Sequence, residues 1–203
     1  MGCQLSAAAC NQWWSGILGT DDYAAEQAGI TGEKLGRDPV FWLPYLMGER
    51  TPHNDALARG AFLGMSMDTD RSDLTQAVLE GVAFGLKDGL LAMGKQGAGL
   101  RRSRICGGGA KSPVWRRILA NVLDLQLDLL AAEEGPALGG AMLAAVGCGA
   151  YADVAEAAGQ IVRTAGTVEP EPELAARYAE RYAVWKELYP RLRELFPRMA
   201  AEA

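Results

Sequence analysis

The sequence predicts an α/β protein, in which short strands alternate with helices. Segments such as 40–43 and 126–130 are short, apolar or alternating, and bounded by Pro, Gly or polar residues, which is typical of strands. A longer stretch at 72–93 has apolar residues at every third or fourth position, which is typical of a helix. Alternation of the two patterns with short loops favours an α/β domain. The order of the strands within a sheet is left open.

Length and composition limit the possible functions. The chain has 203 residues, of which 49% are apolar and 22% are charged. This length suits one large domain or two small ones, and the composition excludes intrinsic disorder. With 20 Lys and Arg against 25 Asp and Glu, the net charge is −5, so nucleic acid is not an expected partner. The single His excludes a metal site built from several histidines.

The cysteines and the hydropathy pattern predict a cytoplasmic protein. Cys3, Cys10, Cys106 and Cys148 contain no C-x-x-C pair, and their spacing fits neither a disulfide framework nor a zinc site. We therefore expect buried free thiols in a reducing compartment. Because no run of about 18 uncharged apolar residues occurs, no membrane association is expected.

The first third of the chain is predicted to contain two helices and two strands. The helices cover 5–18 and a shorter segment that starts at Asp21 and Asp22 and ends near Gln27. Strands at 40–43 and 61–65 flank a polar loop, and loops held on rigid scaffolds often carry function.

A long helix is predicted from Ser72 and Asp73 to about residue 93. Gly81, Gly85 and Gly89 lie four residues apart and therefore share one face of this helix. Each Gly in a helix interior costs about 1 kcal/mol relative to Ala. The row therefore indicates close approach of another backbone, and we expect a helix–helix contact in the core.

The second half of the chain continues the alternation. A strand at 104–106 runs into a glycine turn at 107–110, and a helix follows with Ser112 as its N-cap and Pro113 as its first residue. The remaining predicted elements are a strand at 126–130, helices at 136–150 and 153–158, an extended segment at 168–170, and a helix at 172–199 that is broken near Pro190 and Pro197.

The glycine turn at 107–110 is the strongest local indication of a ligand site. Glycines between a strand and a helix N-terminus expose backbone N–H groups to an anion such as phosphate. The turn matches neither the G-x-x-x-x-G-K-[ST] nor the G-x-G-x-x-G pattern, so a purely structural turn is an equal alternative. A second glycine cluster at 135–140 also opens a helix, and two such turns favour a nucleotide cleft.

Charged residues in two loops allow both a catalytic and a structural interpretation. His53 and Asp55 suggest an acid–base pair, but we favour the alternative that they fix the loop and a domain interface. Glu49 and Arg50 suggest a local ion pair of small energetic value. The carboxylates at 133–134 precede the second glycine cluster, and we expect them in a solvated loop.

Three longer segments carry specific motifs. They are LPYLMGERTPHNDALARG at 43–60, GAFLGMSMDTDRSDLTQAVLEG at 60–81 and ICGGGAKSPVWR at 105–116. All three resemble signature segments in the carboxyl-terminal domain of the FGGY carbohydrate kinases, and the resemblance is closest to the xylulokinases. The opening GCQLSAAACNQWW and the ALGGA of 137–141 are also similar to family segments, so the resemblance covers essentially the whole chain.

The resemblance implies a ribonuclease-H-like fold of the actin and sugar-kinase type with added helices over residues 1–203. It implies ATP and Mg²⁺ as cofactors, and transfer of the ATP γ-phosphoryl group to a sugar hydroxyl. In the family, the proton-accepting carboxylate, the D-x-G-T phosphate loop and most sugar contacts belong to the amino-terminal domain. No D-x-G-T occurs in this sequence. We therefore expect the ATP-binding half of a kinase, without catalytic residues or metal ligands of its own, whose sugar-binding domain is absent.

The resemblance also assigns nucleotide-binding positions. Gly108, Gly109 and Ala110 match the segment that lines the adenosine and the α-phosphate in the family. Pro113 occupies the position at which glycerol kinases carry an Asn near the adenine, so a side-chain hydrogen bond is lost there. Ala8 matches a Gly close to the phosphates, which is a departure from the family pattern. Gln12 matches a position on the ribose or adenine side.

The sugar and the oligomeric state are less constrained. The TPH of 51–53 favours D-xylulose, with D-xylulose 5-phosphate as the product, and gluconate and ribulose kinases are the alternatives within the family. A nucleotide-binding or interaction module without catalysis is the alternative from another class. Loop 44–59 and the glycine face of helix 72–93 suit the interface with the absent domain. An exposed interface would favour self-association, such as a homodimer.

Overall fold

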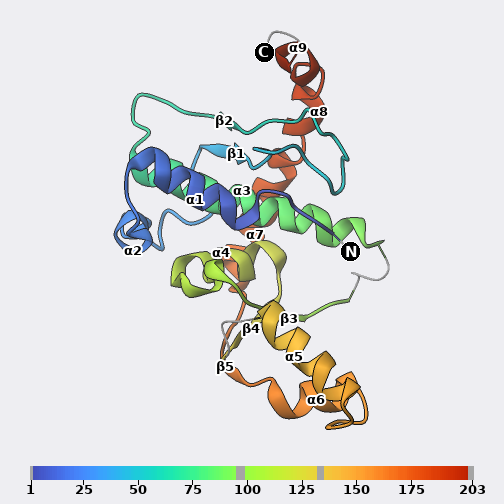
Figure 1. The fold of residues 1–203 in the computed structure, drawn as a ribbon. Helices are drawn as coiled ribbons and strands as arrows, with labels where there is room; N and C mark the ends of the chain where they lie inside the picture. Colours follow the sequence, from blue (N-terminus) through green and yellow to red (C-terminus); the bar gives the residue numbers. More distant parts are fainter. Residues whose placement is uncertain (1, 95–98, 132–134, 201–203) are drawn as a thin grey trace.

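The computed structural model describes residues 2–94, 99–131 and 135–200, and it shows the predicted alternation of helices and short strands (Figure 1). One sheet pairs β1 (Phe41–Leu43) with β2 (Ala61–Leu63) in antiparallel orientation. The other has the order β3–β4–β5, in which β3 (Arg102–Ile105) is parallel to β4 (Gln126–Leu130) and β5 (Thr164–Val168) is antiparallel to β4.

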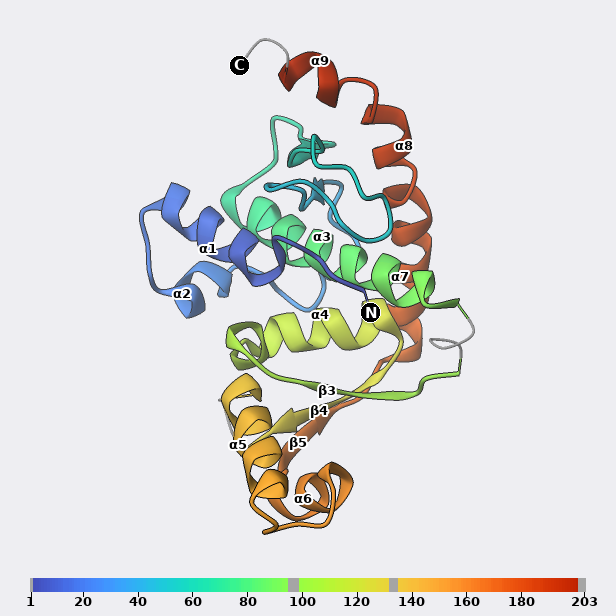
Figure 2. The same cartoon turned by 45° about the vertical axis from the view of Figure 1, so that its right-hand side comes forward.

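The helices form layers on and between the two sheets. Helix α3 lies at the centre, with α1 and α4 packed against it and α7 packed against α4. The β1–β2 ribbon covers α3 on the side away from α4, and α5 and α6 lie beyond the second sheet (Figures 1 and 2). The helices are α1 (Ala7–Leu18), α2 (Tyr23–Gln27), α3 (Arg71–Ala92), the 3-10 helix η2 (Gly108–Lys111), α4 (Pro113–Leu123), α5 (Gly135–Gly147), α6 (Val154–Ile161), α7 (Pro172–Trp185), α8 (Leu188–Leu192) and α9 (Phe196–Ala200).

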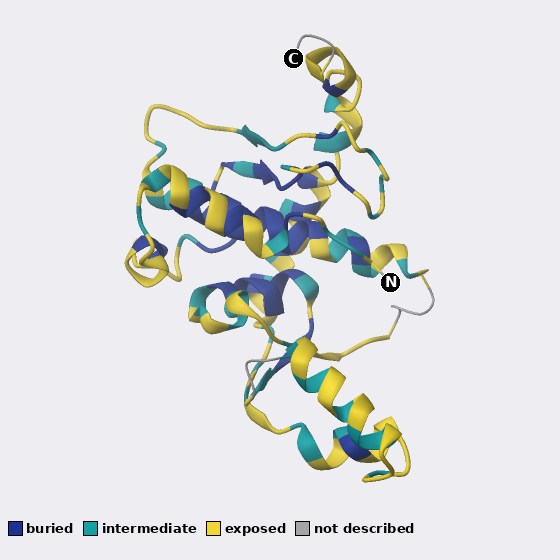
Figure 3. Ribbon diagram, viewed as in Figure 1, coloured by how far each residue is buried: buried dark blue, intermediate teal, exposed yellow. Residues whose placement is uncertain are grey.

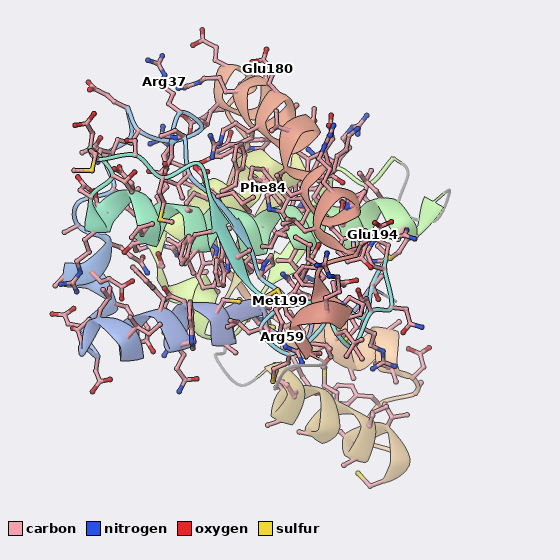
Figure 4. The ribbon with its side chains drawn as sticks, turned by 90° about the horizontal axis from the view of Figure 1, so that it is seen from above. Arg37, Arg59, Phe84, Glu180, Glu194 and Met199 are labelled. Atoms are coloured by element: carbon pink, nitrogen blue, oxygen red, sulfur yellow. The ribbon has the colours of Figure 1, made fainter. Side chains whose placement is uncertain are left out.

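The hydrophobic core gathers around α3, α4, α7 and the β1–β2 ribbon. Phe84 of α3 is fully buried and lies at the centre of the molecule in Figure 4, whereas Arg37 and Glu180 point outward. Trp42 of β1 stands opposite Phe62 of β2, and their ring centroids are 4.3 Å apart. The ribbon therefore closes the core through aromatic contact between its two strands.

Helix α3 begins slightly earlier than predicted, because Asp70 caps it rather than Ser72 or Asp73. The Asp70 carboxylate accepts the N–H groups of Ser72 at 2.7 Å and Asp73 at 3.0 Å. The Asp73 carboxylate in turn accepts the N–H of Asp70 at 2.9 Å. This reciprocal capping box satisfies N–H groups that have no partner inside the helix. Three neighbouring residues of capping type made the position ambiguous in the sequence.

The close backbone contact predicted for the glycine row of α3 is confirmed at Gly81, but its partner is not a helix, and Gly85 faces the side chains of Gln4 and Pro44 instead. A Cβ atom at Gly81 would overlap the carbonyl oxygen of Trp42 in β1, and one at Gly89 would lie 3.7 Å from the Cα of Gly2. The partners are therefore β1 and the N-terminal segment. All the glycines of the row are buried within the chain. The prediction that this helix face forms an exposed domain interface is wrong.

A buried ion pair joins α3 to α7. Glu80 is 1% exposed, and its carboxylate accepts from the guanidinium of Arg181 at 2.9 Å, the hydroxyl of Tyr178 at 2.9 Å and the amide of Gln76 at 2.8 Å. Arg181 also donates to the carbonyl oxygen of Asp38, in the loop before β1. Because a buried charge is unfavourable without such partners, the network holds α3, α7 and this loop in one arrangement.

The C-terminal helical region is broken near Pro190 and Pro197, as predicted, and each break lies just before its proline. Helix α7 ends at Trp185, Pro190 lies within α8, and Pro197 lies within α9. Each proline occupies the first turn of its helix, where the missing N–H has no intrahelical partner to lose. The prolines therefore stand at the starts of new helices and do not interrupt one long helix.

Not all the cysteines are buried. Cys10 is buried as predicted, and burial raises the pKa of its thiol to about 12. Cys3 is half-buried, and the prediction is wrong for Cys106 and Cys148, which are exposed. Cys106 follows the edge strand β3 and Cys148 follows α5, so neither lies under another layer of the fold.

Helix α5 is apolar, yet it is not covered. It consists of Gly, Pro, Ala, Leu, Met and Val, and none of its residues is buried (Figure 3). Leu143, for example, is 62% exposed. An apolar surface of this kind promotes self-association, but it lies on a different element from the predicted interface. Within the described ranges, no helix has the length and the apolar character needed to cross a bilayer.

Gly81→Ala should destabilise the protein, because the added methyl group would overlap the Trp42 carbonyl oxygen. Overpacking typically lowers the free energy of unfolding by about 1–3 kcal/mol. Gly140→Ala is the matched control, since nothing lies within 4 Å of a Cβ at that helical position, and Ala is the better helix former by about 1 kcal/mol. Denaturant unfolding measures both variants, and equal stabilities would contradict the packing argument.

Asp38 should make stability depend on pH. Its side chain is buried, one carboxylate oxygen accepts the N–H of Val40 at 2.8 Å, and the other has no hydrogen-bond partner among the described residues. Burial, together with the nearby charge of Glu80, raises the pKa of this carboxyl to about 7. In the unfolded chain an Asp has a pKa of about 4. Its contribution to stability is therefore fully present below about pH 4 and is lost as the pH rises through 7.

The neutral variant Asp38→Asn tests this. Its melting temperature should exceed that of the wild type at pH 8, and the difference should shrink or vanish at pH 4, because both side chains are then uncharged. Thermal unfolding at the two pH values measures the difference. A difference that is the same at pH 4 and pH 8 would show that Asp38 is not the titrating group.

Candidate functional site

A cavity of about 530 Å³ lies between α1, α2 and the start of α4. Residues from 8–12 of α1 and 23–27 of α2 form one wall, and residues from 108–115 form the other. Both cartoons show α1 and α2 beside the end at which α4 begins (Figures 1 and 2). The cavity thus joins two parts of the chain that are about a hundred residues apart.

The cavity brings together five of the six predicted site residues: Ala8, Gln12, Gly108, Gly109 and Pro113. Ala8 and Gln12 are four residues apart on α1, so they share one face of the helix. Ala110 is not part of the cavity wall. Its N–H donates to the carbonyl oxygen of Gly107 at 3.1 Å and closes the glycine turn.

The glycine turn presents open backbone to the cavity. Gly107 has φ of 87°, in the left-handed region that favours glycine. A Cβ atom at Gly108 would meet nothing within 4 Å, whereas one at Gly109 would lie 3.0 Å from the ring of Trp115. Gly108 is therefore the position at which a side chain would take up free space, whereas a side chain at Gly109 would crowd the ring of Trp115.

Ser112 and Pro113 begin α4 as predicted. The Ser112 hydroxyl oxygen accepts the N–H of Trp115 at 3.1 Å and donates its proton to Oε1 of Gln27 at 2.5 Å. This second bond links α4 to α2 across the cavity. The start of α4 also carries the partial positive charge of a helix N-terminus.

The charge of the cavity wall suits an anion. Lys111 lines the cavity, and none of the described lining residues is an Asp or a Glu. The indole of Trp115 and the ring of Tyr23 add apolar surface. An arrangement of this kind accommodates a ligand that combines a flat apolar ring with an anionic group.

Sequence reasoning did not identify Asn11, Tyr23, Gln27 and Lys111 as lining residues. Gln27 belongs to a residue type that is common on solvated helix faces and lies outside the family-like segments, whereas Asn11 lies within the segment GCQLSAAACNQWW. An available signal was that Asn11 directly precedes Gln12, which the family resemblance assigns to the nucleotide site. Helix α2 contains only five residues, as the predicted short helix did not extend beyond Gln27, and no motif marked it as part of a site.

The other candidate pair, His53 and Asp55, is built into the loop. The Asp55 carboxylate accepts from the N–H of Leu57 at 2.8 Å and the hydroxyl of Tyr189 at 3.0 Å. The His53 ring stacks on Tyr189 with centroids 3.8 Å apart, and its Nε2 lies 3.9 Å from Asp88. Burial lowers the pKa of His53. These contacts support the interpretation that the pair fixes the loop.

The predicted ion pair between Glu49 and Arg50 does not form in the described chain. Glu49 is buried, and its carboxylate accepts the N–H groups of Thr51 at 2.6 Å and His53 at 2.8 Å. Burial raises the pKa of Glu49. A carboxylate that binds the backbone of its own loop in this way stabilises the loop geometry.

Two further predictions concern the region around 135. The second glycine cluster begins α5, and its described residues do not line the cavity, although a Cβ at Gly135 would lie 3.0 Å from the Sγ of Cys106, just before the first turn. Glu133 and Glu134 lie outside the described residues. In the parts of the chain that are described, no group of three His, Cys, Asp or Glu side chains could hold a metal ion.

Comparison with known proteins gives a consistent result. The family model for the C-terminal domain of the FGGY family of carbohydrate kinases matches residues 3–148. Curated xylulose kinases from Staphylococcus epidermidis and Escherichia coli are 32% and 35% identical over 93% and 95% of this chain. A crystal structure described as that of a xyloylose kinase from Brucella ovis is 40% identical, covers 96% of this chain and has a TM-score of 0.84.

The chain spans only 38–40% of the length of these relatives. The superposition confirms the predicted mixed α/β fold of the actin and sugar-kinase type. On these grounds the chain belongs to the FGGY family of carbohydrate kinases, and it corresponds to their carboxyl-terminal domain.

Proposed function

We propose that this chain is the ATP-binding half of a cytoplasmic sugar kinase that transfers the γ-phosphoryl group of ATP to D-xylulose. The observation that carries the proposal is the convergence of Ala8, Gln12, Gly108, Gly109 and Pro113 on one cavity. The family resemblance links all of these positions to the nucleotide, although α1 and the glycine turn lie far apart in the sequence.

The chemistry of the cavity supports a nucleotide ligand. The open backbone at Gly108, the N-terminus of α4 and Lys111 provide positive potential for phosphate groups. The apolar surface around Trp115 suits a purine ring. Because residue 108 is a glycine, no side chain at this position blocks a ligand from the backbone of the turn.

Phosphoryl transfer depends on positioning, charge neutralisation and a group that accepts the proton of the hydroxyl. We assign to this chain the positioning of the nucleotide. The proton acceptor and most sugar contacts belong to an amino-terminal domain, which we propose as the partner. Mg²⁺ would neutralise charge on the ATP phosphates, and we assign it no ligand here because no suitable cluster occurs among the described residues.

D-xylulose is proposed as the acceptor on two grounds. Both curated relatives described above are xylulose kinases, and the segment 51–53 reads TPH, as in the xylulokinase signature. His53 and its loop are shaped by internal contacts with Tyr189 and Glu49. We therefore propose that the loop contributes a fixed surface next to the sugar-binding domain.

Gly108→Val should weaken ADP binding by about tenfold or more, because a branched side chain would fill the free space beside the turn. Stability should change little, since no protein atom lies within 4 Å of the added Cβ. Gly159→Val, at a similarly open position on α6, is the control. Calorimetric titration with ADP measures both variants. Wild-type affinity in folded Gly108→Val would overturn the assignment of the cavity.

The 203-residue chain alone should bind ADP but should not phosphorylate D-xylulose. The physical reason is that no D-x-G-T phosphate loop occurs in it and that we assign the proton acceptor to another domain. A coupled assay with ATP and D-xylulose measures turnover, and heat-denatured protein gives the background. Turnover well above this background would contradict the proposed division between the two halves.

A further inference from the structure

Tyr23 presents an exposed aromatic ring to the cavity between α1, α2 and the start of α4. Among the described residues that line this cavity, only Tyr23 and Trp115 are aromatic. Trp115 is 4% exposed, and its indole N–H is bonded to the carbonyl oxygen of Leu79, whereas Tyr23 is 40% exposed. Most of the aromatic surface that a ligand in the cavity can reach therefore belongs to Tyr23.

The Tyr23 side chain does not contribute to the polar or aromatic packing of the protein. Within the described ranges it forms no hydrogen bond, ion pair or ring contact. By contrast, the hydroxyl groups of Tyr178, Tyr182 and Tyr189 all donate to carboxylates of other elements. A ring that the protein itself does not engage keeps its face available, which is what stacking on a nucleobase requires.

The geometry of α2 turns Tyr23 towards the start of α4. Tyr23 and Gln27 are one turn apart and share a face of α2. Oε1 of Gln27 accepts the proton of the Ser112 hydroxyl at 2.5 Å, and Ser112 directly precedes Pro113. The face of α2 that carries Tyr23 is therefore the face that meets α4. Tyr23 lies about 6 Å along α2 from this bond, and there Tyr23 and Pro113 both line the open cavity.

Helix α2 is held in place although it is short. The Asp22 carboxylate caps it, because it accepts the N–H groups of Ala24 at 3.1 Å and Ala25 at 3.0 Å. Ser15 of α1 donates its hydroxyl proton to the carboxylate of Glu26 at 2.5 Å. Together with the bond to α4, these contacts fix α2 against both α1 and α4. A ring carried by a fixed helix stacks on a ligand at a small cost of ordering.

We propose that Tyr23 stacks on the nucleobase of the bound nucleotide and that the site thereby favours purines over pyrimidines, an inference that rests on the proposed nucleotide site. The base then lies between the Tyr23 ring and the wall that carries Pro113 and Trp115. Stacking strengthens with the overlapping ring area, and a purine has two fused rings where a pyrimidine has one. In this arrangement the backbone at Gly108 stays open to the phosphates.

Titration calorimetry with ADP and UDP tests the proposal on the 203-residue chain. The two ligands share the ribose and the diphosphate, so the ratio of their affinities reports on the base. The wild type should prefer ADP by about fivefold or more, and Tyr23→Ala should lower the ADP affinity by about tenfold and narrow the ratio. Tyr23→Phe keeps the ring and should keep the ADP affinity. Tyr23→Leu is apolar but not planar, and it should behave like Tyr23→Ala.

Tyr151→Ala is the matched control. Tyr151 is half-buried in the turn between α5 and α6, outside the cavity. This variant should bind both nucleotides as the wild type does. Circular dichroism checks that each variant is folded, which we expect for Tyr23→Ala because residue 23 is exposed and Ala is the better helix former.

The outcomes separate this inference from the proposed function. Weaker ADP binding and a narrowed ratio in Tyr23→Ala and Tyr23→Leu, with Tyr23→Phe and Tyr151→Ala unchanged, support stacking. A wild type that binds both nucleotides equally, wild-type affinities in Tyr23→Ala, or a loss by the same factor for ADP and UDP would overturn stacking while leaving nucleotide binding in place. A wild type that binds neither nucleotide would overturn the proposed function and the inference with it.

Discussion

The buried contact between Glu80 and Arg181 is the interaction on which the arrangement of the helices depends. It places a carboxylate that is 1% exposed against a guanidinium at 2.9 Å, in the middle of α3. Arg181 reaches on to the carbonyl oxygens of Asp38 and Val40, so the same side chain also fixes the chain that leads into β1. Removing one partner of such a pair leaves an uncompensated buried charge. Helix α3 therefore has one position relative to α7 and β1.

The two walls of the cavity are both attached to α3. The indole N–H of Trp14 in α1 donates to the hydroxyl of Thr75 at 2.9 Å, and the indole N–H of Trp115 in α4 donates to the carbonyl oxygen of Leu79 at 3.1 Å. Thr75 and Leu79 are one turn apart on α3. The separation of α1 from α4, and hence the width of the cavity, is thus set by one helix. A ligand would bind between walls that are already in place, which limits the cost of ordering them.

Local features of the fold could be predicted from the sequence where a residue type has a single structural role. Ser112 and Pro113 predicted the start of α4, and Gly81 predicted a close backbone contact. The partner of that contact could not be predicted, because a bare Cα accommodates a strand such as β1 as well as a helix. The cap of α3 was misplaced for a related reason, since Asp70, Ser72 and Asp73 are all suitable caps.

Site residues that lie in family motifs were predicted, whereas lining residues outside these motifs were missed. Gly108 and Gln12 were identified from resemblance, and the cavity brings them together. Gln27 was not identified, because its importance comes from Ser112, a residue 85 positions away in the sequence. The same holds for the loop around His53, whose geometry depends on Tyr189 in α8. Long-range pairing of polar atoms leaves no periodicity or spacing in a single sequence.

The central claim is that nucleotide binds between α1, α2 and the glycine turn. A crystal structure of the 203-residue chain grown with ADP tests it most directly. We expect ADP in this cavity, with its base beside Trp115 and its phosphates beside Gly108. ADP bound elsewhere, for instance in the apolar cavity of about 430 Å³ lined by Gly85 of α3 and Ile105 of β3, would contradict it.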